Sequence, residues 1–420
     1  MKAGVIKEYP TSAIQKITWE TNKTYSGAIM EFNQKVNVEL LKKSIVSVIN
    51  KQGLLRSILI MSDGDMKIEE HDIVDNMNIP YLNLEGVNKN LKKQVMDFII
   101  GELYRENLEN RNGMFNKLLY KMIIVRFDST KFMVYMPFNH LIFDGMSMEI
   151  IKANIRRAYS NNGEFKEQVV CGYDTYVGQL HLGPQGVSEK ELMKKFNLNY
   201  FRESFKKYDQ VFKNSSFSNN TISIKLTMDI YERIKEMSWN VSINIFQKIL
   251  ECNFDMESMP FVMMYQDRKH KINNYYNTVG EFIDVLPLNF KKGETFDLTR
   301  VNSLISFARE KNINFSTLLG NTHLKEQYKK INNALKGVYT DSINVPIFNY
   351  LDIYDAKEEN KGLGVEVERA LSESGELSME IVVTLYKDEL KVNLFCEEHK
   401  KKEITEELQR YIYNLGNIPL

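Results

Sequence analysis

The sequence predicts a mixed α/β fold, an α/β (α+β) sandwich, and not a parallel doubly wound sheet. Two apolar stretches, residues 118–127 and 132–138, are separated only by a turn at Asp128-Ser129. Sequential strands joined by such a turn usually pair antiparallel. Helical patterns are interspersed with the strands, which is typical of sheets covered by helices. The 420 residues are too many for one compact core and predict two domains of ordinary size.

The composition is that of a globular protein without a strong net charge. Hydrophobic residues make up 43% and charged residues 26% of the chain. Lys and Arg number 55, as do Asp and Glu, so no net field attracts nucleic acid or an anionic membrane. No apolar run approaches the roughly 18 residues of a membrane span, and the start lacks a signal-peptide core. We expect a cytoplasmic protein with neither nucleic-acid nor membrane partners.

The cysteines predict neither a disulfide framework nor a metal site. Cys171, Cys252 and Cys396 are odd in number and far apart, which fits a reducing cytosol. A buried, inert thiol is the expected role of each. The sequence contains no glycine-rich phosphate loop and no His/Cys/Asp cluster with metal-ligand spacing, so no metal is predicted.

In the first half, apolar periodicity predicts alternating strands and helices. The helix at 39–50 carries its apolar residues on one face, as expected for a helix packed on a core. The predicted strands are 28–32, 57–61, 67–70, 118–127 and 132–138, and the predicted helices are 39–50, 89–108 and 147–159.

Residues 131–159 predict a strand, a short turn and a helix. Both faces of 132–138 are largely apolar, which suits a strand buried on both sides. Asp144-Gly145 interrupts the pattern, and apolar residues then recur at helical spacing up to Tyr159. His140 and Asp144 therefore fall in the connection from a strand to a helix, a place where a rigid scaffold can position reactive side chains.

The spacing His-x-x-x-Asp-Gly has a chemical interpretation. The neutral imidazole of His140 can accept a proton near neutral pH, as a general base does. Asp144 precedes the helix and could cap it or pair with a buried arginine. Gly145 permits a backbone conformation that a side chain would block. Taken alone, these six residues are better explained by a structural histidine in an ordinary strand-to-helix turn.

A wider resemblance changes that judgement. NHLIFDGMS resembles the His-His-x-x-x-Asp-Gly signature of the condensation domains of nonribosomal peptide synthetases and of chloramphenicol-acetyltransferase-like acyltransferases. Asn139 replaces the first His of the signature, and His140 supplies the second, to which the family's chemistry is credited. The start of the chain resembles the family's Ser-x-Ala-Gln-x-Arg-Leu-Trp motif, with matches at Ser12, Gln15 and Trp19.

Two arginines are expected to support the site. Residues 51–57 resemble the family's Arg-His-Glu-x-Leu-Arg-Thr motif and retain Arg56, for which we expect a structural ion pair. Arg268 follows a predicted strand at 261–265, where the family carries an arginine that pairs with the Asp of the signature. Arg268 is therefore the candidate partner of Asp144, and the alternative is an exposed arginine in a basic loop.

The second half carries two further resemblances. VGEFIDVLPL at 279–288 resembles Ile/Val-Gly-x-Phe-Val-Asn-Thr followed by Leu-Pro-Leu; Gly280 and Phe282 match, and Asp284 replaces the Asn. A Gly before the apolar run and a Pro inside it predict an edge or crossing segment, at about 279–290. Residues 341–350 resemble the family's Arg-Asp-x-Ser-Arg-Asn-Pro-Leu region and the strand after it. Asn349 in this strand either faces the central tunnel of the family's fold or bonds within a sheet.

The remaining second-half elements are predicted from the same periodicities. They are a charged helix at 189–208, a strand at 221–226, helices at 228–237 and 242–251, a hairpin of 377–385 with 389–395, and a helix at 403–415. Residues 178–188 are rich in turn residues and form the candidate linker. We therefore expect domains at 1–178 and 179–420, and His181 in a solvated loop.

The resemblance implies two chloramphenicol-acetyltransferase-like subdomains in a V-shaped pseudo-dimer, with a central tunnel and His140 near its middle. It implies catalytic positions at His140, Asp144 and Gly145, with Asp144 organising the loop and the Gly145 N–H as an oxyanion donor. Asn139, Arg268 and Arg56 are the expected supports. The expected tunnel residues are Ser147, Gly280, Phe282, Asp284 and Asn349.

The implied reaction is transfer of an acyl or peptidyl group from a carrier-protein thioester to an amine, forming an amide. The phosphopantetheine arm would be delivered by the carrier protein, with no permanently bound cofactor, and we expect a free-standing monomer. An ester-forming acyltransferase with an alcohol acceptor would use His140 in the same way. A non-catalytic, partner-recruiting member is the alternative from another class, favoured by Asn139 and the weaker motifs; an epimerase is a lesser alternative.

Overall fold

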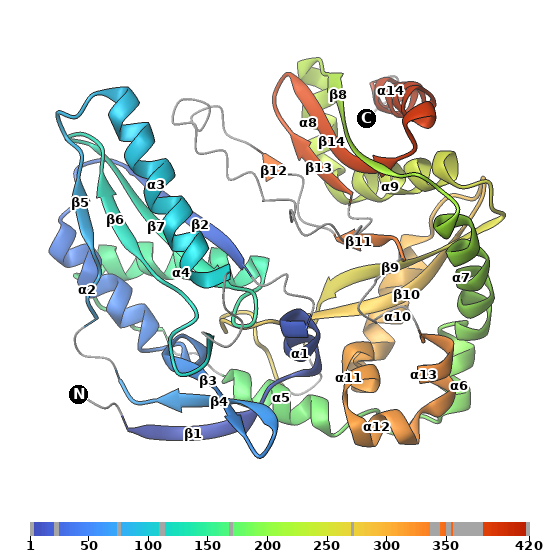
Figure 1. Ribbon diagram of the computed structural model, residues 1–420, viewed down its shortest axis with the longest axis horizontal. Coiled ribbons are helices and arrows are strands. Elements are labelled where there is room, and N and C mark those ends of the chain that lie inside the picture. Colours follow the sequence, from blue (N-terminus) through green and yellow to red (C-terminus); the bar gives the residue numbers. More distant parts are fainter. Residues whose placement is uncertain are drawn as a thin grey trace. The chain divides into compact units, whose positions relative to one another are not determined.

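The computed structural model describes residues 4–20, 25–73, 77–108, 114–167, 171–269, 273–336, 345–349, 354–355 and 381–416 (Figure 1). The described residues form several small sheets with interspersed helices, which confirms the predicted mixed α/β fold. They divide into two compact units. The first unit contains the residues up to Gly183 together with Asp267–Ile283, and the second begins at Pro184 and contains the remainder.

The first unit contains two sheets, with strand orders β1-β4-β3 and β2-β7-β6-β5. The strands are β1 (Val5–Pro10), β2 (Tyr25–Asn33), β3 (Ser57–Ser62), β4 (Asp65–His71), β5 (Tyr81–Asn83), β6 (Ile123–Arg126) and β7 (Lys131–Asn139). Strand β7 pairs antiparallel with β2 along its whole length. On its other side it pairs antiparallel with β6, which confirms the predicted pairing, although β6 is shorter than the strand predicted at 118–127. Strand β7 is thus an interior strand of the larger sheet.

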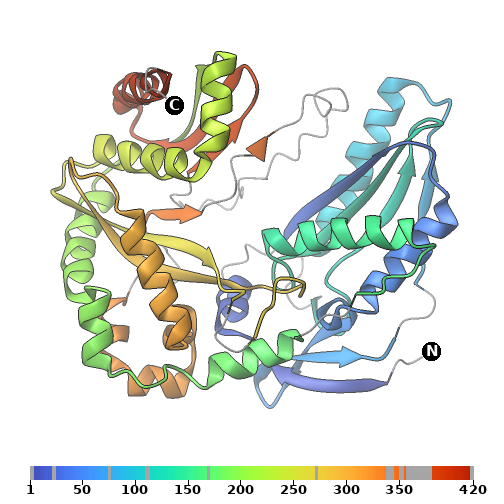
Figure 2. The same cartoon turned by 180° about the vertical axis from the view of Figure 1, so that it is seen from behind.

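Helices cover both faces of the larger sheet in the first unit. The helices are α1 (Ala13–Glu20), α2 (Val38–Ile49), α3 (Lys89–Leu108), α4 (Gly145–Ser160) and α5 (Tyr173–His181), with the 3-10 helix η1 (Gly53–Arg56). Figures 1 and 2 show α3 on one face of the sheet and α2 with α4 on the other. Buried residues at helical spacing, such as Ile45 of α2 and Ile155 of α4, form the core on that face.

The second unit has its own core and two further sheets, with strand orders β10-β9-β11 and β12-β13-β14-β8. Its strands are β8 (Ser218–Lys225), β9 (Ser258–Gln266), β10 (Ile283–Lys291), β11 (Ile347–Asn349), β12 (Tyr354–Asp355), β13 (Val382–Leu385) and β14 (Glu389–Cys396). Aromatic rings dominate the packing, as in the stacked pair Phe261 and Phe290, with centroids 4.2 Å apart. The predicted hairpin turn at Lys387-Asp388 joins β13 and β14.

The helices of the second unit confirm most of the predicted elements. They are α6 (Glu189–Lys195), α7 (Leu198–Lys213), α8 (Met228–Glu236), α9 (Ser238–Asn253), α10 (Leu298–Glu310), α11 (Phe315–Gly320), α12 (Thr322–Gln327), α13 (Lys329–Ala334) and α14 (Lys401–Leu415), with the 3-10 helix η4 (Glu398–Lys400). The single helix predicted at 189–208 is wrong, because Asn197 adopts a left-handed conformation (φ 52°) between α6 and α7. Asn tolerates this conformation, and it ends the first helix there.

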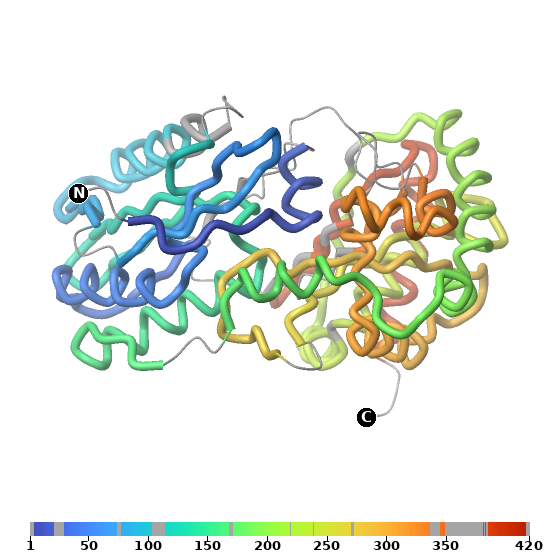
Figure 3. Tube along the Cα trace, turned by 90° about the horizontal axis from the view of Figure 1, so that it is seen from below, coloured from blue at the N-terminus to red at the C-terminus, as the bar shows by residue number. Residues whose placement is uncertain are grey.

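The predicted domain boundary at residue 178 lies inside α5 and is also wrong. The helix continues to His181, which is its last residue and not part of a loop, and Gly183 follows with φ 66°. A glycine with positive φ just beyond a helix is a common C-terminal stop. The division between the units therefore falls after Gly183. Figure 3 shows α5 in green as a continuous helix at this position.

The crossing segment is shared between the two units. Its first residues, up to Ile283, belong to the first unit, and the rest form β10, an edge strand of the second unit that contains Pro287. An edge position is what a proline inside a strand predicts. Among the described residues, no helix is long and apolar enough to cross a bilayer, and no cluster of His, Cys, Asp and Glu could hold a metal ion.

Candidate functional site

His140 is the first residue after β7, at the start of the turn that leads into α4. Strand β7 is buried from Phe132 to Asn139, whereas the His140 side chain is half-buried. The ring meets Phe138 edge-on at 5.9 Å, and Phe138 stacks on Phe143 at 4.2 Å. The imidazole is therefore held against an aromatic pair that itself belongs to the core.

A backbone carbonyl orients the His140 ring. Nδ1 of His140 lies 3.2 Å from the carbonyl oxygen of Phe143. A carbonyl oxygen only accepts hydrogen bonds, so Nδ1 must carry the proton that makes this bond. The neutral ring then carries its lone pair on Nε2, which is the arrangement that a general base requires.

Asn139 organises the turn that carries His140. Its side chain is buried, and Oδ1 accepts a hydrogen bond from the N–H of Leu141 at 2.9 Å. Nδ2 donates to the sulfur of Met114 at 3.4 Å, and the Asn139 carbonyl accepts from the N–H of Ile142 at 3.1 Å. The residue in the first position of the signature thus supports the loop, as expected.

Asp144 connects the loop, helix α4 and Arg268. It is the N-cap of α4, and its Oδ1 accepts from the Ser147 N–H at 2.7 Å. The same oxygen lies 2.5 Å from Nη2 of Arg268, and the two side chains are 0% and 1% exposed. The predicted Asp144–Arg268 pair is present, and Arg268 is not the exposed loop residue of the alternative. Because both charges are buried, each depends on the other for stabilisation.

Arg268 also fixes the segment that returns to the first unit. Nη1 donates to the carbonyl oxygens of Tyr275 at 3.0 Å and Thr278 at 2.5 Å. The guanidinium lies 4.3 Å from the centroid of the Phe282 ring, a cation–π contact. Phe282 in turn donates its N–H to Oδ2 of Asp144 at 3.4 Å. The loop at His140 and the segment 275–282 are therefore joined through one buried ion pair.

Three of the expected tunnel residues instead hold this segment in place. The Ser147 hydroxyl is fully buried and accepts from the Gly280 N–H at 3.0 Å and from Arg268 at 2.9 Å. A Cβ at Gly280 would lie 2.3 Å from the Tyr173 ring, so only glycine fits there. Phe282 packs among the rings of Tyr173, Tyr176 and Tyr275. These residues attach the segment to the rest of the first unit.

The other two expected tunnel residues belong to the second unit. Asp284 is fully buried, and its carboxylate accepts from the N–H groups of Phe315 and Ser316 at the start of α11, each at 3.0 Å. It also accepts from the Tyr265 hydroxyl at 3.0 Å, so its role is structural. Asn349 ends β11, where its backbone pairs with Met264, but its side chain lies outside the described residues.

Two further expectations concern Gly145 and Arg56. Gly145 is the exposed first residue of α4 and is not among the described residues with positive φ, so the predicted need for glycine's conformational freedom is wrong. Its N–H lies at the N-terminus of α4, where the helix dipole favours negative charge. Arg56 pairs with Glu70 at 2.8 Å and donates to the His71 carbonyl, which confirms the structural ion pair.

Sequence reasoning assigned no role to two residues that support the His140 loop. The side-chain amide of Gln15 is buried and donates to the carbonyl oxygen of Leu141, next to His140. Its Oε1 accepts from the N–H of Ser12 at 2.8 Å, and the Ser12 hydroxyl lies 3.3 Å from that of Tyr173. The match at Ser12 and Gln15 in the opening motif was the available signal.

Glu281 is a further buried residue for which the sequence predicts no role. Its side chain is buried beside the Asp144–Arg268 pair and accepts a hydrogen bond from the Ile283 N–H at 3.3 Å. Burial, and next the nearby negative charge of Asp144, raise the pKa of Glu281 well above its ordinary value of 4.5. Only a protonated carboxyl fits this environment without a large desolvation cost.

Replacing Glu281 with glutamine should change how stability depends on pH. Above pH 4.5, Glu281 is ionised in the unfolded chain but stays protonated in the folded chain. The free energy of unfolding of the wild type therefore falls by up to about 1.4 kcal/mol per pH unit, until the pH reaches the raised pKa of the folded state. Glutamine resembles the protonated acid and removes this loss. Urea unfolding across a pH series should therefore show Glu281→Gln gaining stability over the wild type with rising pH.

A matched exposed carboxylate provides the control for this measurement. Glu406 lies on α14 with a side chain that is 57% exposed, so Glu406→Gln should parallel the wild type at every pH. A Glu281→Gln curve that also parallels the wild type would mean that the buried carboxyl is ionised at neutral pH.

Comparison with known proteins identifies relatives of the whole chain. The family model described as "Condensation domain" matches residues 5–418. Among solved structures, the epimerization domain of the third module of tyrocidine synthetase B has a TM-score of 0.64 at 13% identity, covering 99% of this chain and 98% of that one. The first condensation domain of the CDA synthetase has a TM-score of 0.58 at 13% identity, with coverages of 98% and 97%.

A third similar structure is the tallysomycin biosynthesis protein TlmII, with a TM-score of 0.61 at 10% identity and 98% coverage of both chains. At these identities the structures establish a shared fold. No curated protein matches the sequence.

Proposed function

Because the chain belongs to the Condensation domain family, we propose that it transfers an acyl or peptidyl group from a carrier-protein thioester to an amine acceptor, as a condensation enzyme of nonribosomal peptide biosynthesis. One observation carries the proposal beyond family membership. His140 leaves a buried strand with Nδ1 directed at the Phe143 carbonyl, and the adjoining Asp144 is locked by Arg268. With Nδ1 bonded to that carbonyl, the lone pair of the neutral ring lies on Nε2, as proton acceptance from an amine requires.

In the proposed reaction, the amine nitrogen attacks the thioester carbonyl carbon. The new C–N bond forms, the carbonyl oxygen becomes an oxyanion, and the C–S bond then breaks to release the thiol. Nε2 of His140 accepts the proton that the nitrogen loses and returns it to the leaving sulfur. The N–H of Gly145, at the N-terminus of α4, donates to the oxyanion. Aminolysis of a thioester is downhill, so holding the reactants together supplies much of the acceleration.

The thiol in this proposal is the end of a phosphopantetheine arm and arrives as part of the substrate on a peptidyl or acyl carrier protein. No permanently bound cofactor is required. The second substrate is a small-molecule amine, and the protein acts as a monomer. Asp144 serves as a positioning residue, because its carboxylate is fully engaged with Ser147 and Arg268 and has no part in proton transfer.

An ester-forming reaction is the second candidate, since an alcohol acceptor would lose its proton to the same nitrogen. One experiment separates these products from each other and from a recruiting role. The full chain is incubated with an acyl-loaded carrier protein and a panel of amines and alcohols, and mass spectrometry identifies the acceptors that gain the acyl group. A protein-dependent amide supports the proposal, a protein-dependent ester supports the second candidate, and a carrier that stays loaded with every acceptor contradicts both.

A further inference from the structure

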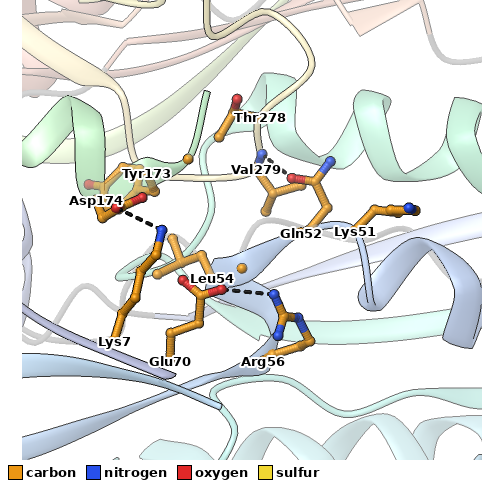
Figure 4. A pocket seen from close by; sticks show the side chains of 12 residues that line it. Lys7, Lys51, Gln52, Leu54, Arg56, Glu70, Tyr173, Asp174, Thr278 and Val279 are labelled. Atoms are coloured by element: carbon orange, nitrogen blue, oxygen red, sulfur yellow. Dashed lines mark hydrogen bonds and ion pairs between the residues drawn. The ribbon is translucent and has the colours of Figure 1, made fainter. Parts of the chain in front are cut away.

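A polar cavity of about 210 Å³ lies in the first unit, apart from His140. Helix η1, strands β1 and β4, the start of α5 and the segment at Thr278 and Val279 all contribute to its lining. Figure 4 shows the side chains that surround it, with charged groups of both signs directed at the same space. Neither His140 nor Phe143 lines this cavity, so the acyltransferase site does not explain it.

Two ion pairs border the cavity at different depths. Lys7 and Asp174 lie 2.9 Å apart, with side chains that are 50% and 25% exposed, and form the rim. Arg56 and Glu70 lie 2.8 Å apart, with side chains that are 10% and 8% exposed, and form the floor. Lys51 also lines the cavity, so the lining carries three cationic side chains (Lys7, Lys51 and Arg56) and two anionic ones (Glu70 and Asp174). A ligand in the cavity therefore meets charges of both signs.

Each pair retains bonding capacity. The ammonium group of Lys7 has three donors, and the bond to Asp174 uses one of them. Oε1 of Glu70 accepts from Arg56, and Oε2 has no protein donor among the bonds made by the described residues. The cavity thus offers a cationic donor at its rim and an anionic acceptor at its floor.

The absence of a side chain at Gly53 leaves room for the Glu70 carboxylate. A Cβ on Gly53 would lie 2.7 Å from the carboxyl atoms of Glu70, so a side chain there would displace the carboxylate. The preceding residue, Gln52, donates its side-chain amide to the Asn277 carbonyl at 2.8 Å and accepts from the Val279 N–H at 2.9 Å. These contacts, all within the first unit, hold the 52–53 part of the lining against Glu70 and the segment at Val279.

We propose that this cavity binds a small zwitterion of the free α-amino acid class, with its ammonium group on Glu70 and its carboxylate on Lys7. Ligand pockets for larger molecules occupy about 300–1,000 Å³, so a cavity of about 210 Å³ suits a ligand of amino-acid size. Charge-assisted hydrogen bonds to both groups would form only with a ligand that carries both charges. A simple amine would bond to Glu70 only and a simple carboxylate to Lys7 only. In either case the other charged side chain would lose water without gaining a hydrogen bond.

A ligand bound in the cavity should also stabilise the segment that holds the His140 loop. Thr278 and Val279 line the cavity, and the next residue, Gly280, bonds to the Ser147 hydroxyl. A bound ligand should therefore slow amide hydrogen exchange in residues 277–282 of the full chain. This readout locates the ligand, and neither it nor binding itself depends on the proposed acyltransferase activity.

Calorimetry with the full chain tests the proposal, using glycine, L-alanine and L-leucine as probes and acetate and ethylamine as single-charge controls. We expect saturable binding of at least one amino acid, at least about tenfold tighter than either control. Gly53→Ala and Lys7→Met should each weaken that binding by about tenfold or more. Glu69→Gln is the matched control, because Glu69 neighbours Glu70 on β4 but does not line the cavity, and it should bind like the wild type.

Two variants keep the test decisive if one of them folds poorly, since Lys7 is at the exposed rim and Gly53 leaves every charge unchanged. Absence of binding by all three amino acids overturns the proposal and leaves the ion pairs with a purely structural role. Binding that both variants retain in full, or that acetate or ethylamine matches, overturns it as well.

Discussion

Replacing Arg268 with methionine should lower the free energy of unfolding by about 3–5 kcal/mol, because it leaves the Asp144 carboxylate buried without its counter-charge. Asp144 is 0% exposed, so water cannot replace the guanidinium. The variant also loses the bonds to the Tyr275 and Thr278 carbonyls and the contact with the Phe282 ring. Urea denaturation of the wild type and Arg268→Met measures the difference.

An exposed arginine pair supplies the control. Arg157 and Glu167 lie 2.9 Å apart with side chains that are 54% and 48% exposed, so Arg157→Met should cost less than about 1 kcal/mol. Adding Asp144→Asn to Arg268→Met should recover part of the loss, because the unpaired charge is removed while an N-cap side chain remains. If Arg268→Met and Arg157→Met lowered the free energy of unfolding equally, the buried Asp144–Arg268 pair would not stabilise the fold as described.

Replacing His140 with alanine should reduce the rate of acyl transfer by about 10²–10⁴-fold, the contribution typical of a positioned general base. The melting temperature should stay close to that of the wild type. His140 is half-buried, and the Asp144 cap, not the histidine, anchors the start of α4. Initial rates with a loaded carrier protein and an accepted amine, together with thermal melts by circular dichroism, provide the two readouts.

His399→Ala is the matched control for this pair of measurements. His399 lies in η4 of the second unit with a side chain that is 73% exposed, and its replacement should leave both the rate and the melting temperature unchanged. If His140→Ala transfers the acyl group at the wild-type rate, the proton acceptor lies elsewhere.

The strand, turn and helix around His140 were predictable because their local patterns are long and unambiguous. A stretch that is apolar on both faces predicts β7, and helical spacing predicts α4, with Asp144 as a candidate cap. The Asp144–Arg268 pair joins residues 124 positions apart, and only the family resemblance linked them before the structure was available. The periodicity of apolar residues predicts which face of a helix or strand is buried. It does not predict which residues far apart in the sequence form a pair, and here only the family resemblance did so.

Side-chain direction in the returning segment could not be predicted in the same way. Ser147, Gly280 and Phe282 were expected beside a channel because the family motif lies near the active site. Phe282 is buried by Tyr173 and Tyr275, which come from other parts of the chain, and Ser147 is bonded to Arg268 and Gly280. A motif locates a residue in the sequence but does not show which distant side chains will pack on it.

Three further features, the contact of Gln15, the helix break at Asn197 and the burial of Glu281, were not predicted, because each depends on a single residue or on a distant contact. Gln15 bonds to the Leu141 carbonyl across 126 residues, and the opening motif includes Gln15 but does not show which distant group it contacts. The break at Asn197 depends on one left-handed residue inside a stretch that is otherwise helical in pattern. The raised pKa of Glu281 follows from its burial, which an acidic residue in an apolar segment does not by itself predict.

The direction in which the His140 ring presents its lone pair can be measured by nitrogen-15 NMR of protein labelled in its six histidine rings. The signals absent from His140→Ala identify the ring. Hydrogen bonding to the Phe143 carbonyl predicts that the neutral ring carries its proton on Nδ1 and leaves Nε2 as the basic nitrogen. A neutral ring protonated on Nε2 would contradict the assignment of this nitrogen as the proton acceptor in acyl transfer.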